Sequence, residues 1–336
     1  MTQFFLQKKD YNRTMQIVEA VPNISEGRRP EVIQRIANAT QNIPGGARIL
    51  HIDANPDANR TVMTLAGTPQ AVEKSLFMLI QTTTQEIDMR IQRGAHPRLG
   101  AVDVCPIVPI RGITLSDTAR LAEQFARRVA NQLHLPTYLY EANALTPQRK
   151  NLAFIRRGEY ENLASKLHTL PPDFGPTQYD EHIAKTGAIV IGARNFLIAF
   201  NMSLDTQDIS IAREIATRLR QSSGGLPYVK AIGWYMDHYH CAQVSCNLTD
   251  YAQTGLAQVW ETCRQEATAL NTHITAGELI GLIPLDALTQ VGQFYKPEEK
   301  NSATLVDVAV ENLLLNKIRP FMPEERILEY KLKQLL

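Results

Sequence analysis

The chain has 336 residues, of which 44% are hydrophobic and 21% charged, so a disordered or fibrous protein is excluded and about two domains are expected. Its 35 Lys and Arg balance 34 Asp and Glu, and without a basic run this argues against a nucleic-acid partner. The four cysteines form no Cys-x-x-Cys pair, and we find neither a signal-peptide core nor a membrane-spanning apolar run. We therefore expect a cytoplasmic protein with reduced thiols and no membrane partner.

The first half of the chain predicts an alternation of strands and helices after an extension at residues 1–14. Periodicity and turn residues predict a strand, a helix, two strands, a helix, a strand, a helix and a short strand. In chain order these elements are predicted at 15–21, 30–40, 47–54, 59–66, 69–91, 101–110, 116–132 and 137–141. Pro106 and Pro109 cannot donate to a sheet, so the strand that contains them is expected to be an edge strand or bulged.

The second half repeats this order of elements after a stretch rich in Pro and Gly at residues 168–186. Its predicted strands are 187–193, 195–204, 229–236 and 242–248, and its predicted helices are 206–221, 251–270, one starting at 276–285, and a tail at 303–336. We therefore expect an α+β protein with two ferredoxin-like βαββαβ subdomains, at 1–186 (extension included) and at 187–336 (helical tail included).

Motifs for nucleotide or serine-hydrolase chemistry are missing from the sequence. There is no Gly-x-x-x-x-Gly-Lys, no Gly-x-Gly-x-x-Gly after a strand and no Gly-x-Ser-x-Gly. The best metal-like cluster is Asp237-His-Tyr-His-Cys241, where His238 and His240 would share a face of a strand. No third ligand has a fixed spacing, so a polar hairpin turn is the preferred interpretation and no metal is expected.

His96 is the strongest candidate for chemistry. It lies in a loop punctuated by Gly and Pro, close in sequence to Arg93 and Arg98. Nearby cations disfavour the imidazolium and keep the ring neutral, as a general base requires. Because most loop histidines do no chemistry, this pattern alone does not assign the role.

Polar turns follow several predicted strands of the first half. Asp53 ends an apolar strand, where a buried carboxylate needs a partner. The turns around residues 23, 53 and 96 are expected to meet at one edge of the sheet, where loops converge into sites. Turn and capping chemistry is the plainer explanation of each turn taken singly.

At these residues the chain resembles the formiminotransferase family, which includes glutamate formimidoyltransferases and the formiminotransferase unit of formimidoyltransferase-cyclodeaminases. The similarity runs in order from residue 18 to about residue 295. The matching stretches are VPNISEG (21–27), DANPDANRTV (53–62), HPRLGAVDVCPIVPIRG (96–112), PDFGP (172–176), GARNFLIAFNMSL (192–204), AIGWY (231–235), AQVSCNLTDYAQTGL (242–256) and GLIPLDAL (281–288).

The resemblance implies transfer of a formimino group from N-formimino-L-glutamate to N5 of tetrahydrofolate, with release of L-glutamate. It implies His96 as the catalytic base and Asp53 as its assistant. Folate contacts are implied in segments 175–187 and 226–233. The residues expected to bind substrate are Asn23, Arg60, Arg98, Gly175, Gly187, Val229 and Gly233, since arginines bind the carboxylates of both substrates.

The resemblance also implies two subdomains with a substrate groove between them, a homodimer, and tetrahydrofolate as co-substrate without a metal or redox cofactor. Two departures stand out: Ala95 replaces the Glu common before the His, and residues 178–186 differ from relatives. The cyclodeaminase half is missing from the sequence, so a separate cyclodeaminase is a candidate partner.

Two alternatives stay open from the sequence. The same site could move a formyl group between N5 of folate and glutamate, because the two donors differ only by oxygen in place of nitrogen. A folate-binding module without turnover is the other, and the presence of His96 and Asp53 argues against it.

Overall fold

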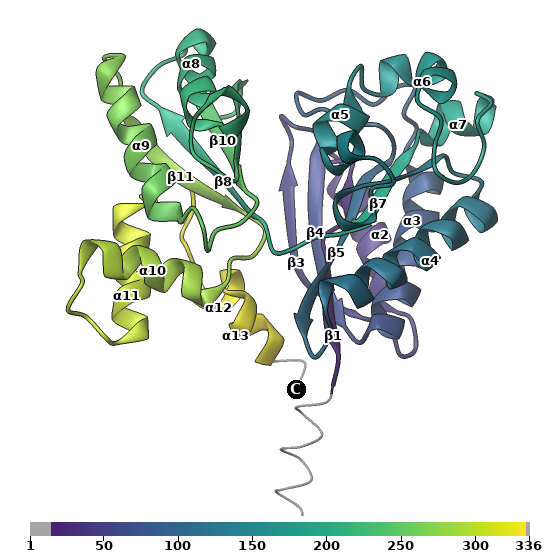
Figure 1. Ribbon diagram of the computed structural model, residues 1–336, viewed down its shortest axis with the longest axis horizontal. Coiled ribbons are helices and arrows are strands. Elements are labelled where there is room, and N and C mark those ends of the chain that lie inside the picture. Colours follow the sequence, from purple (N-terminus) through teal and green to yellow (C-terminus); the bar gives the residue numbers. More distant parts are fainter. Residues whose placement is uncertain (1–14, 334–336) are drawn as a thin grey trace, which may run out of the picture. The chain divides into compact units, whose positions relative to one another are not determined.

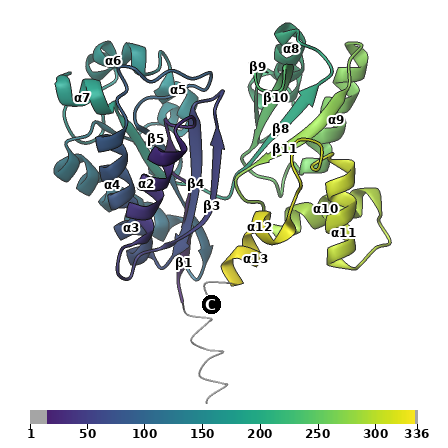
Figure 2. The same ribbon diagram turned by 180° about the vertical axis from the view of Figure 1, so that it is seen from behind.

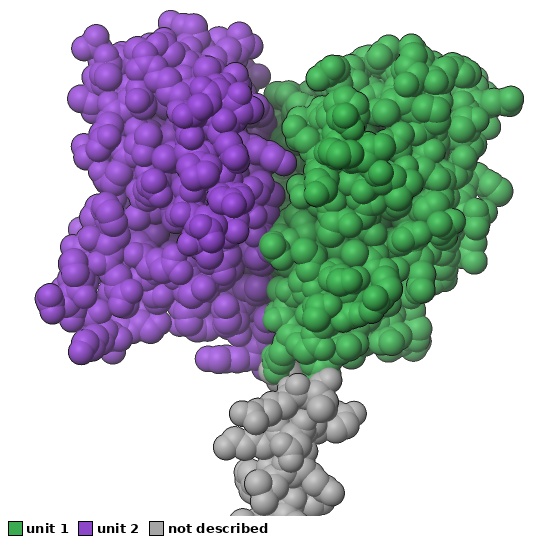
Figure 3. Space-filling view, in the orientation of Figure 1, with its two compact units in different colours: residues 1–195 green, residues 196–336 purple. Residues whose placement is uncertain are grey.

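The protein, in a computed structural model, is described over residues 15–333, so the predicted extension at 1–14 lies outside the described residues. The chain divides into two compact units, Met1–Asn195 and Phe196–Leu336, coloured separately in Figure 3. The division falls nine residues after the predicted boundary at 186. The reason is strand β7 (Ile189–Ala193), which pairs in parallel with β5 (Val102–Arg111) and β6 (Thr137–Leu139) of unit 1.

Unit 1 contains one mixed sheet with helices. Its further strands are β1 (Ile17–Ala20), β2 (Asn23–Ile24), β3 (Arg48–Asn55) and β4 (Arg60–Gly67). Its helices are α2 (Pro30–Gln41), α3 (Pro69–Glu86), α4 (Leu115–Leu133), α5 (Leu152–Arg156), α6 (Leu163–Thr169) and α7 (Glu181–Thr186), with 3₁₀ turns η1 (Glu141–Asn143), η2 (Pro147–Lys150) and η3 (Tyr160–Asn162).

The strands of unit 1 are antiparallel on one side of β5 and parallel on the other. β1 and β2 lie between β4 and β5, β3 lies beyond β4, and β7 and then β6 lie beyond β5. Helices α2, α3 and α4 cover one face of this sheet (Figure 1). The sequence predicted these elements well because their signals are local. Thr68 caps α3 by accepting from the amide of Ala71, and Thr114 caps α4 by accepting from that of Asp117.

The prolines of strand β5 led to the expectation that it is either an edge strand or bulged. It is bulged, since its register against β1 shifts between Ile17 and Val18, which pair with Arg111 and Pro109. The alternative of an edge strand is wrong, because β7 pairs along its other side.

Unit 2 contains an antiparallel sheet. Its strands are β8 (Ile198–Leu204), β9 (Val229–Met236), β10 (Cys241–Leu248) and β11 (Ile274–Ile280), in the order β11-β8-β10-β9. Its helices are α8 (Ile209–Leu219), α9 (Leu256–Ala269), α10 (Leu285–Tyr295), α11 (Ser302–Asn312), α12 (Pro323–Arg326) and α13 (Leu328–Leu332), with the 3₁₀ turn η4 (Gln221–Ser223). Helices α8 and α9 pack on one face of this sheet, as the view from behind also shows (Figure 2).

One predicted element of unit 2 is wrong. The helix expected to start within 276–285 is strand β11 at its beginning, and helix α10 starts only at Leu285. β11 pairs with β8, for example Gly277 with Met202 and Leu279 with Phe200. Periodicity does not distinguish a helix from a strand in a short apolar run, and here the pairing with β8 makes it a strand. As far as residue 333, the predicted helical tail is α11, α12 and α13 with breaks between them, and its last residues, 334–336, lie outside the described residues.

Within residues 15–333, none of the helices combines the length and apolar character needed to cross a membrane.

Candidate active site

The three polar turns predicted to meet are joined by Asn59, in the turn between β3 and β4. Its Oδ1 accepts from the amide of Gly27 at 2.9 Å, and its Nδ2 donates to the carbonyl of Arg93 at 2.8 Å. The amide of Ala95 donates to the carbonyl of Asp57 at 3.1 Å. The prediction that these turns converge is therefore confirmed, and Asn59 holds them at a positive φ of 46°.

A buried ion cluster lies under these turns and is centred on Asp103 of β5. Arg60 Nη1 lies 2.6 Å from Asp103 Oδ2, and the guanidinium of Arg156 binds both carboxylate oxygens. The amide of Leu99 also donates to Asp103 Oδ1 at 3.0 Å. Burial alone would raise the pKa of Asp103, but Arg156 and Arg60 lower this pKa to about 2, so the carboxylate stays ionised.

His96 lies beside this cluster and is partly exposed. Burial first, and then the charges of Arg60 and Arg156, hold the pKa of His96 well below its ordinary value, although Asp103 opposes them. His96 Nδ1 lies 2.7 Å from the carbonyl oxygen of Pro97. A carbonyl only accepts, so Nδ1–H donates to it, and Nε2 is the basic nitrogen of the neutral ring.

Asn23 and Arg60 lie together at the same end of the sheet. Arg60 Nε donates to Asn23 Oδ1 at 3.0 Å, and Asn23 Nδ2 donates to the carbonyl of Val21 at 2.7 Å. Since Arg60 also binds Asp103, one guanidinium connects a predicted substrate-binding residue to the cluster beside His96. Burial, reinforced by Arg156, lowers the pKa of Arg60 to about 10, so this group remains cationic at neutral pH.

Arg98 has its donors occupied within unit 1. Its five N–H groups match five bonds, to Gln92 Oε1 and the Gln92 carbonyl, to Glu159, and to both carboxylate oxygens of Glu161. The side chain is buried, while both glutamates are exposed. Arg98 therefore ties the His96 loop to the turn at residues 159–161.

Asp53 is buried in β3 and pairs across the sheet with Val62, which in turn pairs with Asn23. Its Oδ2 lies 3.8 Å from Nε2 of His51. The charged groups that shift the pKa of His96 are those of the cluster around Asp103. Asp103 is therefore a second candidate carboxylate for the site, and the assisting role of Asp53 stays a prediction.

The predicted glycines of unit 1 permit close contact between backbones. Gly187 has φ of +71°, and a Cβ built on it would lie 2.4 Å from the Cα of Gly100. Gly175 has φ of +88°, and its Cβ would lie 2.4 Å from the carbonyl oxygen of Leu135. Segment 175–187 therefore ends against the strand that follows the His96 loop, where Gly100 and Gly187 form a β-bridge.

Replacing Gly187 by Ala is expected to lower the free energy of unfolding of unit 1 by about 2–4 kcal/mol, because overpacking adds to backbone strain. Urea denaturation measures the change. Gly45→Ala is the matched control, since Gly45 has a similar φ of +67° and the nearest atom, the flexible end of Lys74, would lie 3.8 Å away. Equal losses in the two variants would show that backbone strain, and not contact with Gly100, dominates.

The predicted residues of unit 2 lie on β9 and face the helices. The side chain of Val229 is buried in the core of unit 2. A Cβ at Gly233 would lie 2.3 Å from the backbone nitrogen of Arg213, so Gly233 lets β9 approach α8. At both positions the backbone, and not a side chain, is what a ligand could contact.

Sequence reasoning missed the two partners that organise the site. Asp103 carried a usable signal, since it is a lone carboxylate in an apolar strand, as Asp53 is. Arg156 carried none, because it lies 53 residues from Asp103 and reaches it only after α5 packs. Lys166 helps to place α5, since its Nζ donates to the carbonyls of Ile155 and Arg157, on either side of Arg156.

The His238 and His240 motif lies in the turn between β9 and β10. Tyr239, between them, donates its hydroxyl to Glu278 Oε1 at 3.0 Å. Among the described residues, no group of three His, Cys, Asp or Glu side chains could hold a metal ion.

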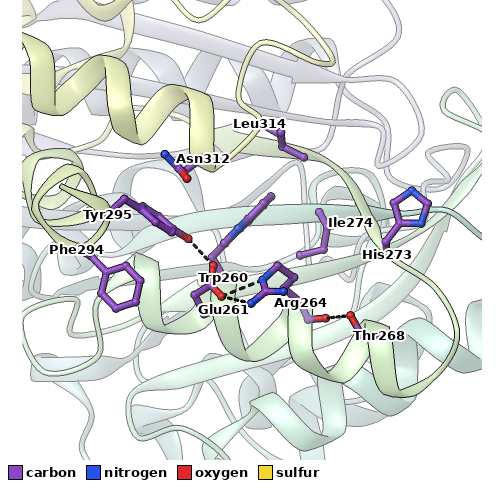
Figure 4. Close-up of a pocket in the computed structure, with 10 residues that line it drawn as sticks. All are labelled: Trp260, Glu261, Arg264, Thr268, His273, Ile274, Phe294, Tyr295, Asn312 and Leu314. Carbon is purple, nitrogen blue, oxygen red and sulfur yellow. Dashed lines mark hydrogen bonds and ion pairs between the residues drawn. The ribbon is translucent and has the colours of Figure 1, made fainter.

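A cavity of about 580 Å³ lies among α9, α10 and the start of β11 (Figure 4). Among its polar groups, Glu261 accepts from the hydroxyl of Tyr295 at 2.5 Å and from the guanidinium of Arg264. None of the predicted site residues lines it.

Two family profiles match the chain: the N-terminal subdomain of the formiminotransferase domain over residues 17–194, and the formiminotransferase domain over residues 199–333. The chain therefore belongs to the formiminotransferase family.

The names of the relatives are more specific than the description of the family. The chain is 40% identical over 280 residues to the glutamate formimidoyltransferase of Streptococcus pyogenes serotype M1, covering 83% of this chain and 93% of that one. It is 37% identical to the glutamate formimidoyltransferase of Thermoplasma acidophilum, over 84% of this chain and 92% of that one. It is 42% identical to the formimidoyltransferase-cyclodeaminase of Rattus norvegicus, covering 94% of this chain but only 60% of that one. Thus the chain spans about 60% of the length of the relatives that carry the double name.

Proposed function

We propose that this chain is a folate-dependent glutamate formimidoyltransferase, which moves the formimino group of N-formimino-L-glutamate to N5 of tetrahydrofolate and releases L-glutamate. Family membership and the names of the relatives support this activity. The observation that carries the mechanism is His96, a neutral imidazole whose Nδ1–H is held by the carbonyl of Pro97, so that Nε2 is the base.

In the first step, the N5 amine of tetrahydrofolate attacks the formimino carbon and forms the new C–N bond. The N5 proton passes to Nε2 of His96 as this bond forms. Because burial, and then the charges of Arg60 and Arg156, disfavour the imidazolium, the ring is in its basic form at neutral pH. Removal of the N5 proton therefore needs no general base other than this imidazole.

In the second step, the bond between the formimino carbon and the glutamate nitrogen breaks. The Nε2–H of His96 returns its proton to that nitrogen, and L-glutamate leaves with a neutral amine. The burial and the neighbouring cations that keep the free ring neutral also make the imidazolium a readier proton donor, which favours this transfer. One imidazole thus serves as base and then as acid, and the reaction balances without a redox cofactor or metal.

We propose that Asn23 and Arg60 bind substrate at this edge of the sheet, and that Asp53 assists by attracting the cationic formimino group. Arg60 is suited to a carboxylate or carbonyl because it is buried and cationic. For Arg98 we propose a positioning role, because its five donors already hold Gln92, Glu159 and Glu161.

We propose that folate contacts the backbones of segments 175–187 and 226–233, including those of Gly175, Gly187, Val229 and Gly233. Both segments have the close-packed glycines that let a backbone approach another group.

For the architecture we propose two ferredoxin-like subdomains. The antiparallel order β5-β1-β4-β3 in unit 1 and β11-β8-β10-β9 in unit 2 supports this, since each is the strand order of a βαββαβ unit. We also propose a cytoplasmic homodimer that needs no metal and works with a separate cyclodeaminase, in line with the double name of the longer relatives.

The test is release of glutamate from N-formimino-L-glutamate by the purified full chain, with and without tetrahydrofolate and with no metal added. Release that requires folate is the expected result. No folate-dependent release with this donor, but release with N-formyl-L-glutamate, would contradict the proposed activity and favour formyl transfer.

A further inference from the structure

The cavity among α9, α10 and the start of β11 is lined by residues of unit 2 alone and has aromatic walls. Trp260 of α9 and Phe294 and Tyr295 of α10 supply the rings, and Ile274 and Leu314 add apolar surface (Figure 4). Phe294 is 56% exposed, so its ring is available to a ligand. The volume of about 580 Å³ is within the range of small-molecule sites.

The indole of Trp260 gives this cavity a hydrogen-bond donor without an acceptor. Trp260 is only 3% exposed, and a buried indole N–H ordinarily finds an acceptor. Trp234 has one, since its Nε1–H donates to Gln243 Oε1 at 2.9 Å. Over residues 15–333 no acceptor bonds the Nε1–H of Trp260. This nitrogen is not among the sealed polar atoms of the described chain that lack a partner, so its N–H opens into the cavity.

The charged pair of the cavity is already satisfied. Both carboxylate oxygens of Glu261 are bound, one by the hydroxyl of Tyr295 and the other by Nε and Nη2 of Arg264. Burial raises the pKa of Glu261, but the bonds from Arg264 and Tyr295 outweigh burial and lower this pKa, so the carboxylate stays ionised. An anionic ligand would meet the charge of Glu261 as well as that of Arg264 and would gain little. The indole N–H of Trp260 instead suits an uncharged acceptor, such as a carbonyl oxygen.

We propose that this cavity is a second ligand site of the chain, which binds a small uncharged aromatic compound whose carbonyl oxygen accepts from the Nε1–H of Trp260. The rings of Phe294 and Tyr295 then pack against the ring of the ligand. None of the residues proposed to bind substrate lines this cavity, so the site is separate from the proposed transfer reaction.

Titration of the ¹⁵N-labelled full chain with acetophenone tests the site directly. The sequence has 2 tryptophans, so the ¹H–¹⁵N spectrum has one indole signal for each, and Trp260→Phe assigns them. Acetophenone is expected to move the Trp260 signal downfield, because its carbonyl accepts from that N–H, and to leave the Trp234 signal in place. An unmoved Trp260 signal overturns the proposal and leaves water as the occupant of the cavity.

Toluene and benzoate keep the ring of acetophenone and change its acceptor. Acetophenone is expected to bind about 3- to 10-fold more tightly than toluene, because toluene forms no hydrogen bond with the indole. It is also expected to bind more tightly than benzoate, because of the charge of Glu261. Equal affinity for acetophenone and toluene would contradict the role of Trp260. A preference for benzoate would overturn the choice of an uncharged ligand.

Variants separate the hydrogen bond from the ring contacts. Trp260→Phe keeps a ring without the N–H and is expected to lower the affinity for acetophenone, measured by calorimetry, to that for toluene. Trp234→Phe removes the other indole and is the matched control, which should change neither affinity. Phe294→Ala removes an exposed ring and is expected to weaken both compounds by about 2- to 10-fold while the preference for acetophenone remains. Equal effects of the two tryptophan variants would contradict the proposal.

Tetrahydrofolate also contains aromatic rings and carbonyl groups, so competition must distinguish its own site from this cavity. The response of the Trp260 signal to acetophenone is expected to be unchanged in the presence of saturating tetrahydrofolate. Displacement of acetophenone by tetrahydrofolate would overturn the assignment to a separate site. Because these experiments measure binding without turnover, their outcome does not depend on whether the chain releases glutamate.

Discussion

Replacing His96 by Ala is expected to lower folate-dependent release of glutamate at least about 100-fold, while the affinity for tetrahydrofolate changes by less than about twofold. General acid–base catalysis contributes about 10²- to 10⁴-fold, and this imidazole is proposed to act in both proton transfers. Steady-state kinetics and calorimetry on the same variant measure the two quantities.

His168→Ala is the matched control for that variant, because His168 is exposed on α6 and should leave the rate unchanged. An equal loss of folate affinity in His96→Ala would assign His96 to binding and not to catalysis. Unchanged turnover would exclude it as the base.

Replacing Asp103 by Asn is expected to lower the free energy of unfolding of unit 1 by about 3–5 kcal/mol. Removal of one partner from a buried ion pair leaves the other charge uncompensated, and here Arg60 and Arg156 would repel each other. Urea denaturation at pH 7 measures the loss. Glu86→Gln breaks a more exposed pair with Arg35 and is expected to cost at most about 1 kcal/mol.

The contribution of Asp103 has a defined dependence on pH. Its folded pKa of about 2 lies below the ordinary value of 3.8, so the stabilisation is present above pH 3.8 and is lost as pH falls through 2. The wild-type protein should therefore lose its advantage over Asp103→Asn in this acidic range. A stability difference that is independent of pH between 2 and 5 would contradict the ion-pair explanation.

Local signals made much of the fold predictable. Thr68-Pro69 and Thr114 predict the starts of α3 and α4, because each capping hydroxyl accepts a hydrogen bond from an amide in the first turn of its helix. Pairing between distant strands was harder to predict. The composition of strand 189–193 does not show to which unit it belongs, and only its pairing with β5 assigns it to unit 1. Strand β11 was missed because Gly277 and Glu278 interrupt its apolar pattern.

The candidate site was predictable in part for the same reason. The convergence of three turns followed from strand order and turn composition, and His96 stood out by its loop and its neighbouring arginines. The cluster whose charges add to the effect of burial on the pKa of His96 did not stand out, because Arg156 belongs to a short helix whose position depends on Lys166 and the packing of unit 1. Side chains that act on a base from distant sequence positions can be identified only from the folded structure.

The contact of Gly100 with Gly187 joins the backbone that follows the His96 loop to the end of segment 175–187. The amide of Ala101 donates to the carbonyl of Thr186 at 2.8 Å, and the amide of Ala188 donates to that of Leu99 at 3.1 Å. With no side chain between the two backbones, neither can shift without carrying the other. A displacement at the end of segment 175–187 is therefore transmitted through rigid main chain to the loop that bears the imidazole, with no side-chain rearrangement to absorb it.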